Sequence, residues 1–227
     1  MDFEGRAFVI TGASCEIGRK LSYILNEYNA KVICIYNKNK IKDYDAYKCD
    51  ITNEKKVKKV FNKIKKKYKH IYGLVNIAGI SIDENYEEKN SRTFKKVINT
   101  NLLGTFLMIK YFSKIIEGCI INMSSLDGIN TFTGYDMDYA SSKAAVNNLT
   151  LNFAKVLKNI KVCAIAPGWI KTKSTLLANP NFIKEQLKKH GQKELLNPEE
   201  VAMKIIEIIV NSDYASGDII RMESYDK

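Results

Sequence analysis

Short apolar runs alternate with longer amphipathic stretches along the whole chain. Runs rich in β-branched residues predict strands, and stretches with apolar residues at three- and four-residue spacing predict helices. The predicted strands cover residues 7–11, 31–36, 46–50, 71–78, 119–124, 161–166 and, with a weaker pattern, 217–222. The predicted helices cover residues 17–28, 54–68, 92–116, 139–157 and 198–210.

Strand and helix patterns follow one another in an order typical of a parallel sheet. Several strands are apolar on both faces, as expected when helices cover both sides of the sheet. The alternation predicts an α/β fold: a single-domain, doubly wound Rossmann fold with a parallel sheet of about seven strands flanked by helices. No linker, repeat or low-complexity segment divides residues 1–227. Residues 171–197 are the longest stretch outside the alternation, and we expect a partly helical insert that serves as a substrate lid.

The composition is that of an ordinary globular protein, with 45% hydrophobic residues. No apolar run approaches the roughly 20 residues that cross a bilayer, and the first residues lack the pattern of a signal peptide. We therefore expect a soluble, cytoplasmic protein without a membrane partner. The five cysteines include no pair at metal-ligand spacing, and four of them fall in or beside apolar runs, so we predict core thiols and no metal site.

The formal net charge of +11 raises the question of nucleic-acid binding. Much of the positive charge lies in residues 54–68, where Val57, Phe61 and Ile64 recur at helical spacing and lysines fill the other face. This pattern is typical of the solvated face of an amphipathic helix. No nucleic-acid-binding motif accompanies it, so we predict no nucleic-acid partner.

Small and polar residues follow several predicted strands, at the edge where such sheets bind ligands. Gly12 and Gly18 flank a tight turn between the first strand and the first helix. Glycine lets the backbone approach a phosphate, and a helix N-terminus supplies unpaired N–H groups. The turn therefore predicts a nucleotide site, although a plain structural turn would use the same glycines. Asn76, Ala78 and Gly79 follow the fourth strand and lie near the same edge.

Tyr139 and Lys143 are four residues apart in a helical pattern, so both side chains project from one face. An ammonium group beside a phenol favours the phenolate, and we expect it to lower the pKa of Tyr139 toward neutrality. The same Tyr-x-x-x-Lys spacing occurs at Tyr36 and Tyr44. Only Tyr139 follows a strand that ends in serines, with Ser125 fourteen residues before it, so we select this pair for proton transfer.

Taken together and in order, these segments resemble the short-chain dehydrogenase/reductase family in its compact form. The motifs TGASCEIG, VNIAG, NTNLLG, INMSS, YASSK and APGWIKT stand at family-like spacings over essentially the whole chain. The opening segment is most similar to the β-ketoacyl-acyl-carrier-protein reductases. The resemblance implies a single NAD(P)-binding Rossmann domain and an oxidoreductase that transfers hydride between nicotinamide and a carbonyl or alcohol substrate.

The resemblance assigns catalytic roles to four residues. It implies that Tyr139 is the general acid or base at the substrate oxygen and that Lys143 holds the nicotinamide ribose. Ser125 would hydrogen-bond the same oxygen, and Asn101 would support a water that leads protons to Lys143. Ser124 is the competing serine, and we prefer Ser125 because of its spacing from the next glycine.

The resemblance also implies which residues contact the cofactor. They are Gly12, Ser14, Cys15, Ile17, Gly18, Asn37, Lys38, Asp50, Ile51, Asn76, Ala78, Gly79, Tyr139, Lys143, Pro167, Ile170 and Thr172. The second strand ends in Tyr36, where NAD-dependent relatives usually carry an acid, and Lys38 is placed to meet a 2′-phosphate. Cys15 argues the other way, because NADP-preferring relatives often have a basic residue there. We favour NADP(H) over NAD(H).

Glu16 departs from the family, which has glycine at this position. A carboxylate about 6 Å from a pyrophosphate would cost about 1 to 3 kcal/mol, or about one to two decades in affinity. The side chain can swing outward, and Arg19 or Lys38 can neutralise it, so we expect weaker binding rather than none. The alternative is a nucleotide-binding protein of the same fold whose catalysis is weak or lost because of Glu16.

The sequence leaves the substrate open between a 3-oxoacyl-carrier-protein and a sugar or other alcohol. We expect its pocket to be formed by the residues after Gly79, by residues 126–138, which include Phe132 and Tyr135, and by Trp169 with the lid. The resemblance further implies a homodimer or homotetramer that pairs the helices carrying Asn101 and Tyr139.

Overall fold

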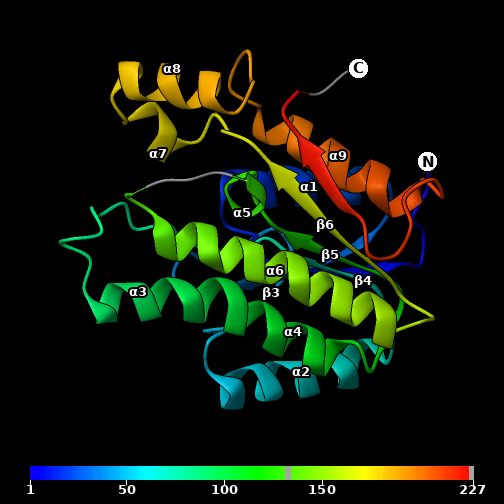
Figure 1. Ribbon diagram of the computed structural model, residues 1–227. Helices are drawn as coiled ribbons and strands as arrows, with labels where there is room; N and C mark the ends of the chain where they lie inside the picture. Colours follow the sequence, from blue (N-terminus) through cyan, green and yellow to red (C-terminus); the bar gives the residue numbers. More distant parts are fainter. Residues whose placement is uncertain (131–133, 225–227) are drawn as a thin grey trace.

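The computed structural model describes residues 1–130 and 134–224, in which strands and helices alternate (Figure 1). The strands are β1 (Ala7–Thr11), β2 (Lys31–Tyr36), β3 (Asp45–Lys48), β4 (Ile71–Asn76), β5 (Ile116–Met123), β6 (Lys161–Pro167) and β7 (Ile219–Met222). The helices are α1 (Glu16–Glu27), α2 (Glu54–Tyr68), α3 (Ser91–Ile98), α4 (Gly104–Phe112), α5 (Asp127–Asn130), α6 (Met137–Val156), α7 (Lys173–Leu176), α8 (Pro180–Lys189) and α9 (Pro198–Val210). A π-helical turn, η1 (Asn99–Leu103), joins α3 to α4.

The strands form one parallel sheet in the order β3-β2-β1-β4-β5-β6-β7, which confirms the predicted fold class. The chain builds outward from β1 to β3 and then crosses to β4 on the other side of β1. Thr11 pairs with Asn76, and Asn76 pairs with Asn122, so the carboxyl ends of β1, β4 and β5 lie level. The loops after these strands therefore meet at the switch point, where open α/β sheets bind ligands.

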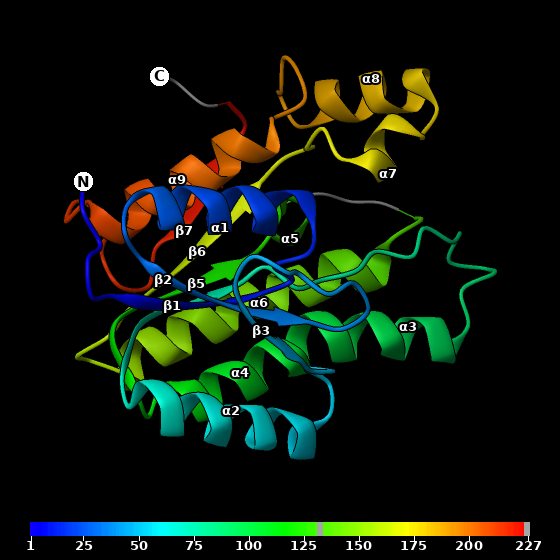
Figure 2. The same cartoon turned by 180° about the vertical axis from the view of Figure 1, so that it is seen from behind.

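Helices cover both faces of the sheet. Helices α1 and α9 lie on one face, and α2, α4 and α6 lie on the other (Figures 1 and 2). Alternate residues of β1 point to opposite faces, since Phe8 and Ile10 belong to the core that includes Leu21 of α1, while Val9 packs with Val57 of α2. The strands are apolar on both faces because both faces are buried.

The single long helix predicted for residues 92–116 is wrong. The segment contains α3, the turn η1 and α4, and helical structure ends at Phe112. A short turn follows, and β5 begins at Ile116, where it pairs with Ile71 of β4. The apolar pattern continues across this break because both α4 and β5 are buried, so periodicity alone did not mark the boundary.

The predicted insert at residues 171–197 contains α7 and α8, which lie together beside the carboxyl end of β6 (Figure 1). Leu196 returns to the sheet edge through a parallel bridge to Ile170. Within the part of the chain that the structure describes, no helix is both long enough and apolar enough to cross a membrane.

Candidate active site

The turn after β1 is closely packed against the end of β4. Gly12 has a φ of +66°, and a Cβ there would lie 2.7 Å from the backbone nitrogen of Ala78. A Cβ on Gly18 would lie 2.5 Å from the carbonyl oxygen of Gly12. Cys15 caps α1, because its Sγ accepts a hydrogen bond from the Gly18 N–H at 3.4 Å. The two glycines are therefore required for the turn itself.

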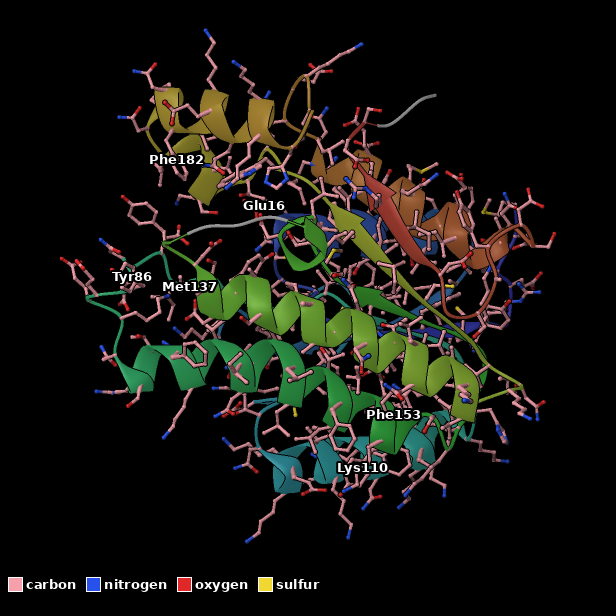
Figure 3. All side chains as sticks on the ribbon, viewed as in Figure 1. Glu16, Tyr86, Lys110, Met137, Phe153 and Phe182 are labelled. Atoms are coloured by element: carbon pink, nitrogen blue, oxygen red, sulfur yellow. The ribbon has the colours of Figure 1, made fainter. Side chains whose placement is uncertain are left out.

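Glu16, the residue that departs from the family, points toward the predicted lid (Figure 3). Its Oε1 accepts a hydrogen bond from the backbone N–H of Lys173 at 2.9 Å. This hydrogen bond is the main reason why the pKa of Glu16 is lowered, and the charge of Arg19 contributes less. The Arg19 side chain donates instead to the carbonyl oxygen of Ser14 at 3.0 Å. The sequence allowed the Glu16 carboxylate either to swing outward or to be neutralised by Arg19 or Lys38. The structure shows the outward swing.

Ser125, Tyr139 and Lys143 come together at the carboxyl end of β5. Gly128 lets α5 approach α6, since a Cβ there would lie 2.6 Å from the backbone carbonyl carbon of Lys143. The ammonium nitrogen of Lys143 lies 5.5 Å from the centroid of the Tyr139 ring and donates to the carbonyl oxygen of Met123 at 2.7 Å. The predicted Tyr-x-x-x-Lys pair thus faces the loop that carries Ser125.

Asn101 is buried in the π-helical turn η1 and holds the loop after β4. Its Oδ1 accepts from the Ile80 N–H at 2.8 Å, and its Nδ2 donates to the Ile80 carbonyl oxygen and to Ser142 Oγ, each at 2.9 Å. A Cβ on Gly79 would lie 3.3 Å from Asn101 Oδ1 and 3.4 Å from Lys143 Nζ. Asn101 and Lys143 therefore converge on the same glycine.

Burial shifts the pKa values of both catalytic candidates on α6. Burial raises the pKa of Tyr139, the carboxylate of Asp127 acts in the same direction, and the Ser125 hydroxyl opposes the shift. Burial also lowers the pKa of Lys143 to about 8. The expectation that Lys143 lowers the pKa of Tyr139 is wrong for the protein alone, because burial and nearby carboxylates disfavour the phenolate more strongly.

The pKa of Lys143 predicts how stability depends on pH. Its folded value of about 8 lies below the unfolded value of 10.5, so the unfolded chain binds more protons between these values. The burial penalty is fully present below pH 8, and stability rises as the pH increases across this window. Lys143→Met should remove a rise of about 3 kcal/mol in the free energy of unfolding. Urea unfolding of both proteins from about pH 7.5 to 10 measures the difference.

Lys155→Met is the control, because Lys155 is exposed on the same helix. This variant should keep the pH-dependent rise of the original protein. Parallel stability curves for the original protein and Lys143→Met would contradict the prediction.

A cavity of about 350 Å³ joins the turn after β1 to the side chain of Tyr139. The predicted cofactor residues that line it are Cys15, Ile17, Gly79, Tyr139, Lys143, Pro167, Ile170 and Thr172. Ser125 lines it as well, whereas Asn101 supports it from behind. The predicted cofactor residues outside its lining are Gly12, Ser14, Gly18, Asn37, Lys38, Asp50, Ile51, Asn76 and Ala78. The structure thus brings only part of the predicted set into one cavity.

The residues outside the cavity border the edge of the sheet. Asn37 and Lys38 are exposed beyond β2, and Asp50 accepts hydrogen bonds from the N–H and hydroxyl of Thr52. Asn76 donates to Asn122, but its buried Oδ1 has no hydrogen-bond partner among the described residues. A buried acceptor without a partner is costly and is often satisfied by a ligand. The close turn and this acceptor fit a dinucleotide laid along the edge.

The cavity also contains charged side chains from the predicted pocket segments, although no role was predicted for any of them. Asp127 lies beside Ser125, and His190 Nε2 at the end of α8 lies 3.3 Å from Asp127 Oδ1. Asp83 and Asp136 line the same space. Asp127 had a usable signal, since it follows Ser125 by two residues, but nothing in the sequence linked it to His190.

The expected substrate pocket is confirmed only in part. Trp169 lines the cavity, and its ring meets that of Phe182 edge-on at 5.8 Å between centroids. Phe182 belongs to the lid (Figure 3) and also lines the cavity, so the lid forms one wall. Tyr135 is not part of the lining and is 58% exposed, so including it was wrong. Phe132 lies outside the described residues.

A buried ion pair anchors the loop after β4 next to Tyr139. Lys89 Nζ lies 2.8 Å from Asp138 Oδ1, and the two side chains are 5% and 0% exposed. The same ammonium group donates to the carbonyl oxygen of Ile82, and Asp138 Oδ1 accepts from the Tyr139 N–H at 2.9 Å. The start of α6 is therefore fixed by a residue that the sequence did not single out.

Comparison with known proteins identifies the family of the chain. The family model described as short chain dehydrogenase matches residues 6–181. The chain is 33% identical to the 3-oxoacyl-[acyl-carrier-protein] reductase FabG of Thermotoga maritima, over 98% of each chain. It is 31% identical to the NAD-dependent glycerol dehydrogenase of Listeria innocua, covering 80% of this chain and 77% of that one.

A solved structure, ElxO with NADP bound, superposes with a TM-score of 0.84 at 29% identity, over 96% of each chain. The family model, the relatives and the fold all identify the same family. The resemblance seen in the sequence is confirmed, and the chain belongs to the short-chain dehydrogenase family of oxidoreductases.

Proposed function

We propose that this oxidoreductase transfers hydride between NADP(H) and a carbonyl or alcohol substrate, using Ser125, Tyr139, Lys143 and Asn101. The observation that carries the proposal is the single cavity that Ser125, Tyr139 and Lys143 share with the start of α1. A proton donor, a cation and a phosphate-compatible turn thus open onto one space. This is the set of groups that carbonyl reduction requires.

The cofactor, when bound, supplies or accepts the hydride. In reduction, the Tyr139 hydroxyl gives its proton to the substrate oxygen while the carbonyl carbon receives the hydride, and in oxidation the phenolate takes that proton back. The raised pKa of Tyr139 keeps the phenol protonated near neutrality. Ser125 donates a hydrogen bond to the same oxygen. Lys143 would hold the cofactor ribose. Asn101 would support a water that leads protons to Lys143.

We favour NADP(H) because the end of β2 presents Tyr36, Asn37 and Lys38. No acid stands at these three positions, and Lys38 is exposed and free to approach a 2′-phosphate. Among the relatives, one is described as NAD-dependent and one has NADP bound, so both cofactors occur in this family. Titrating the protein with NADPH and NADH and recording nicotinamide fluorescence tests the choice. Binding of neither would contradict the proposed function.

The substrate is a 3-oxoacyl-carrier-protein or a sugar or other alcohol. The relative in Thermotoga maritima supports the first class, and the glycerol dehydrogenase supports the second. We also propose that residues 171–197 act as the lid, because Thr175, Ala178 and Phe182 already face the cavity. We expect the protein to work in the cytoplasm.

We infer that the subunits pair through α4 and α6 into a homodimer or homotetramer. Leu151 and Val156 of α6 are 49% and 73% exposed, and Phe106 of α4 meets Phe153 of α6 with 6.2 Å between ring centroids (Figure 3). Exposed apolar side chains grouped on neighbouring helices are typical of subunit contacts. Light scattering on the purified protein gives the number of subunits.

Replacing Glu16 with glycine should tighten NADPH binding. The carboxylate lies beside the turn expected to hold the pyrophosphate, and its removal should lower the Kd by about tenfold. The outward hydrogen bond to Lys173 limits the gain, because it already draws the charge away from the turn. Fluorescence titration of the original protein and Glu16→Gly measures the change.

Glu16→Gln is the matched control, since it keeps the Cβ and removes only the charge. Tightening in both variants assigns the effect to charge, whereas tightening in Glu16→Gly alone assigns it to the side-chain volume. An unchanged or higher Kd in both would contradict the prediction. The competing function, a nucleotide-binding protein with lost catalysis, requires binding without turnover of any carbonyl substrate.

A further inference from the structure

The hydroxyl group of Ser125 is already engaged by a carboxylate of the same loop. Ser125 Oγ donates to Asp127 Oδ2 at 3.1 Å, and the Asp127 N–H donates back to Ser125 Oγ at 3.2 Å. A serine hydroxyl has only one proton to donate. While Asp127 accepts that proton, Ser125 has none left for the oxygen of a substrate.

Two buried polar groups near this pair lack hydrogen bonds. Trp169 Nε1 has no partner among the described residues, although Gln192 fixes the Trp169 backbone through two hydrogen bonds of 2.8 Å. His190 Nε2 lies 3.3 Å from Asp127 Oδ1 without the alignment of a hydrogen bond, and its side chain is 4% exposed. Buried groups of this kind are costly to leave unsatisfied. Both residues belong to the cavity lining.

The charges around the cavity favour a ligand that donates hydrogen bonds. Asp83, Asp127 and Asp136 all line it, and a carboxylate accepts but does not donate. An anionic substrate would be repelled by these side chains. A neutral group with O–H donors matches them.

We propose that the substrate carries a hydroxyl group on the carbon next to its reacting carbonyl, and that Asp127 accepts the hydrogen bond of this hydroxyl. The substrate hydroxyl then replaces Ser125 as the donor to Asp127, and the Ser125 hydroxyl can donate to the carbonyl oxygen. Ser125 Oγ and Asp127 Oδ2 lie 3.1 Å apart, so two oxygens on adjacent carbons of one substrate can each reach one of them. The inference rests on the proposed carbonyl reduction and selects α-hydroxy carbonyls and vicinal diols within it.

A ketone without this neighbouring hydroxyl group cannot donate a hydrogen bond to Asp127. When Ser125 donates to the carbonyl oxygen of such a ketone, the carboxylate of Asp127 loses the hydrogen bond from Ser125 and gains none from the substrate. The transition state therefore has one hydrogen bond fewer. A site built to bind a substrate hydroxyl discriminates strongly against an analogue that lacks it. The expected signature is a kinetic preference that depends on Asp127.

Hydroxyacetone and butanone are the matched test substrates, because a hydroxyl group in one replaces a methyl group in the other. With NADPH, the original protein should show kcat/KM at least about tenfold higher for hydroxyacetone. Asp127→Val should bring the ratio close to one, and Asp127→Asn, which keeps the side-chain size, should give an intermediate ratio. Asp213→Asn, which removes an exposed carboxylate outside the cavity lining, should leave the ratio within about twofold. Equal rates in the original protein, or a ratio unchanged in Asp127→Val, would overturn the inference.

A binding measurement separates this inference from the proposed function. Trp169 is the one tryptophan of the chain and lines the cavity, so its fluorescence reports occupancy. Propane-1,2-diol should bind at least about tenfold more tightly than 2-butanol, and Asp127→Val should remove the difference. Preferential diol binding without turnover of either ketone would refute the proposed catalysis while supporting the subsite. Turnover of both ketones at equal rates would support the proposed catalysis and refute the hydroxyl subsite at Asp127.

Discussion

Replacing Tyr139 with phenylalanine is expected to lower kcat by about 10²- to 10⁴-fold, the range typical of losing a general acid. The ring stays in the cavity lining beside Lys143, and only the hydroxyl group is lost. Cofactor binding should therefore change far less than turnover. Steady-state rates with NADPH and a panel of ketones, sugars and acyl thioesters, together with the fluorescence titration, measure both quantities.

Tyr44→Phe is the matched control. Tyr44 has a lysine four residues later, as Tyr139 does, but it is not part of the cavity lining. Its turnover should stay within about twofold of the original protein. Comparable losses in the two variants, or a Tyr139→Phe protein that retains most of its turnover, would remove Tyr139 from the mechanism.

The second large effect concerns stability. Lys89→Met should lower the free energy of unfolding by about 3 to 5 kcal/mol, because it leaves the carboxylate of Asp138 buried without its cation. The two side chains are 5% and 0% exposed, so water cannot compensate for the lost partner. Urea unfolding measures the change as a lower midpoint with an unaltered slope.

Lys110→Met provides the comparison for a surface pair. Lys110 lies on α4 and contacts Glu54 at 2.6 Å, with both side chains about half exposed (Figure 3). Its loss should cost less than about 1 kcal/mol. The double variant Lys89→Met/Asp138→Asn should recover part of the stability, since it removes the buried charge. A Lys89→Met protein as stable as Lys110→Met would contradict the argument.

The sequence predicted the sheet and most helices because buried positions recur as apolar residues with the period of the element. The strands are apolar on both faces, and α2 and α9 have the predicted ends, Glu54–Tyr68 and Pro198–Val210. The break after Phe112 does not interrupt the apolar pattern, because α4 and β5 are both buried. What ends the helix is the pairing of Ile116 with β4, a contact across the sheet.

The candidate site was predictable only where neighbours in sequence are neighbours in space. Tyr139 and Lys143 share one helical face, so their spacing was informative. The contacts of Glu16 with Lys173 and of Asp127 with His190 depend on where the lid folds back, and no local pattern encodes that. The direction of the Tyr139 pKa shift was missed for the same reason, since it arises from burial and from the carboxylates gathered around the cavity.

The turn after β1 shows that three positions of one motif are constrained by the structure in different ways. Gly12 is held by backbone conformation, and Gly18 is held by contact with the neighbouring backbone. Position 16 is the first residue of α1, where any residue can adopt the helical backbone, and its side chain reaches outward to Lys173. Substitution there is therefore open to drift without loss of the fold. A search that demands glycine at all three positions would discard homologues whose architecture is intact.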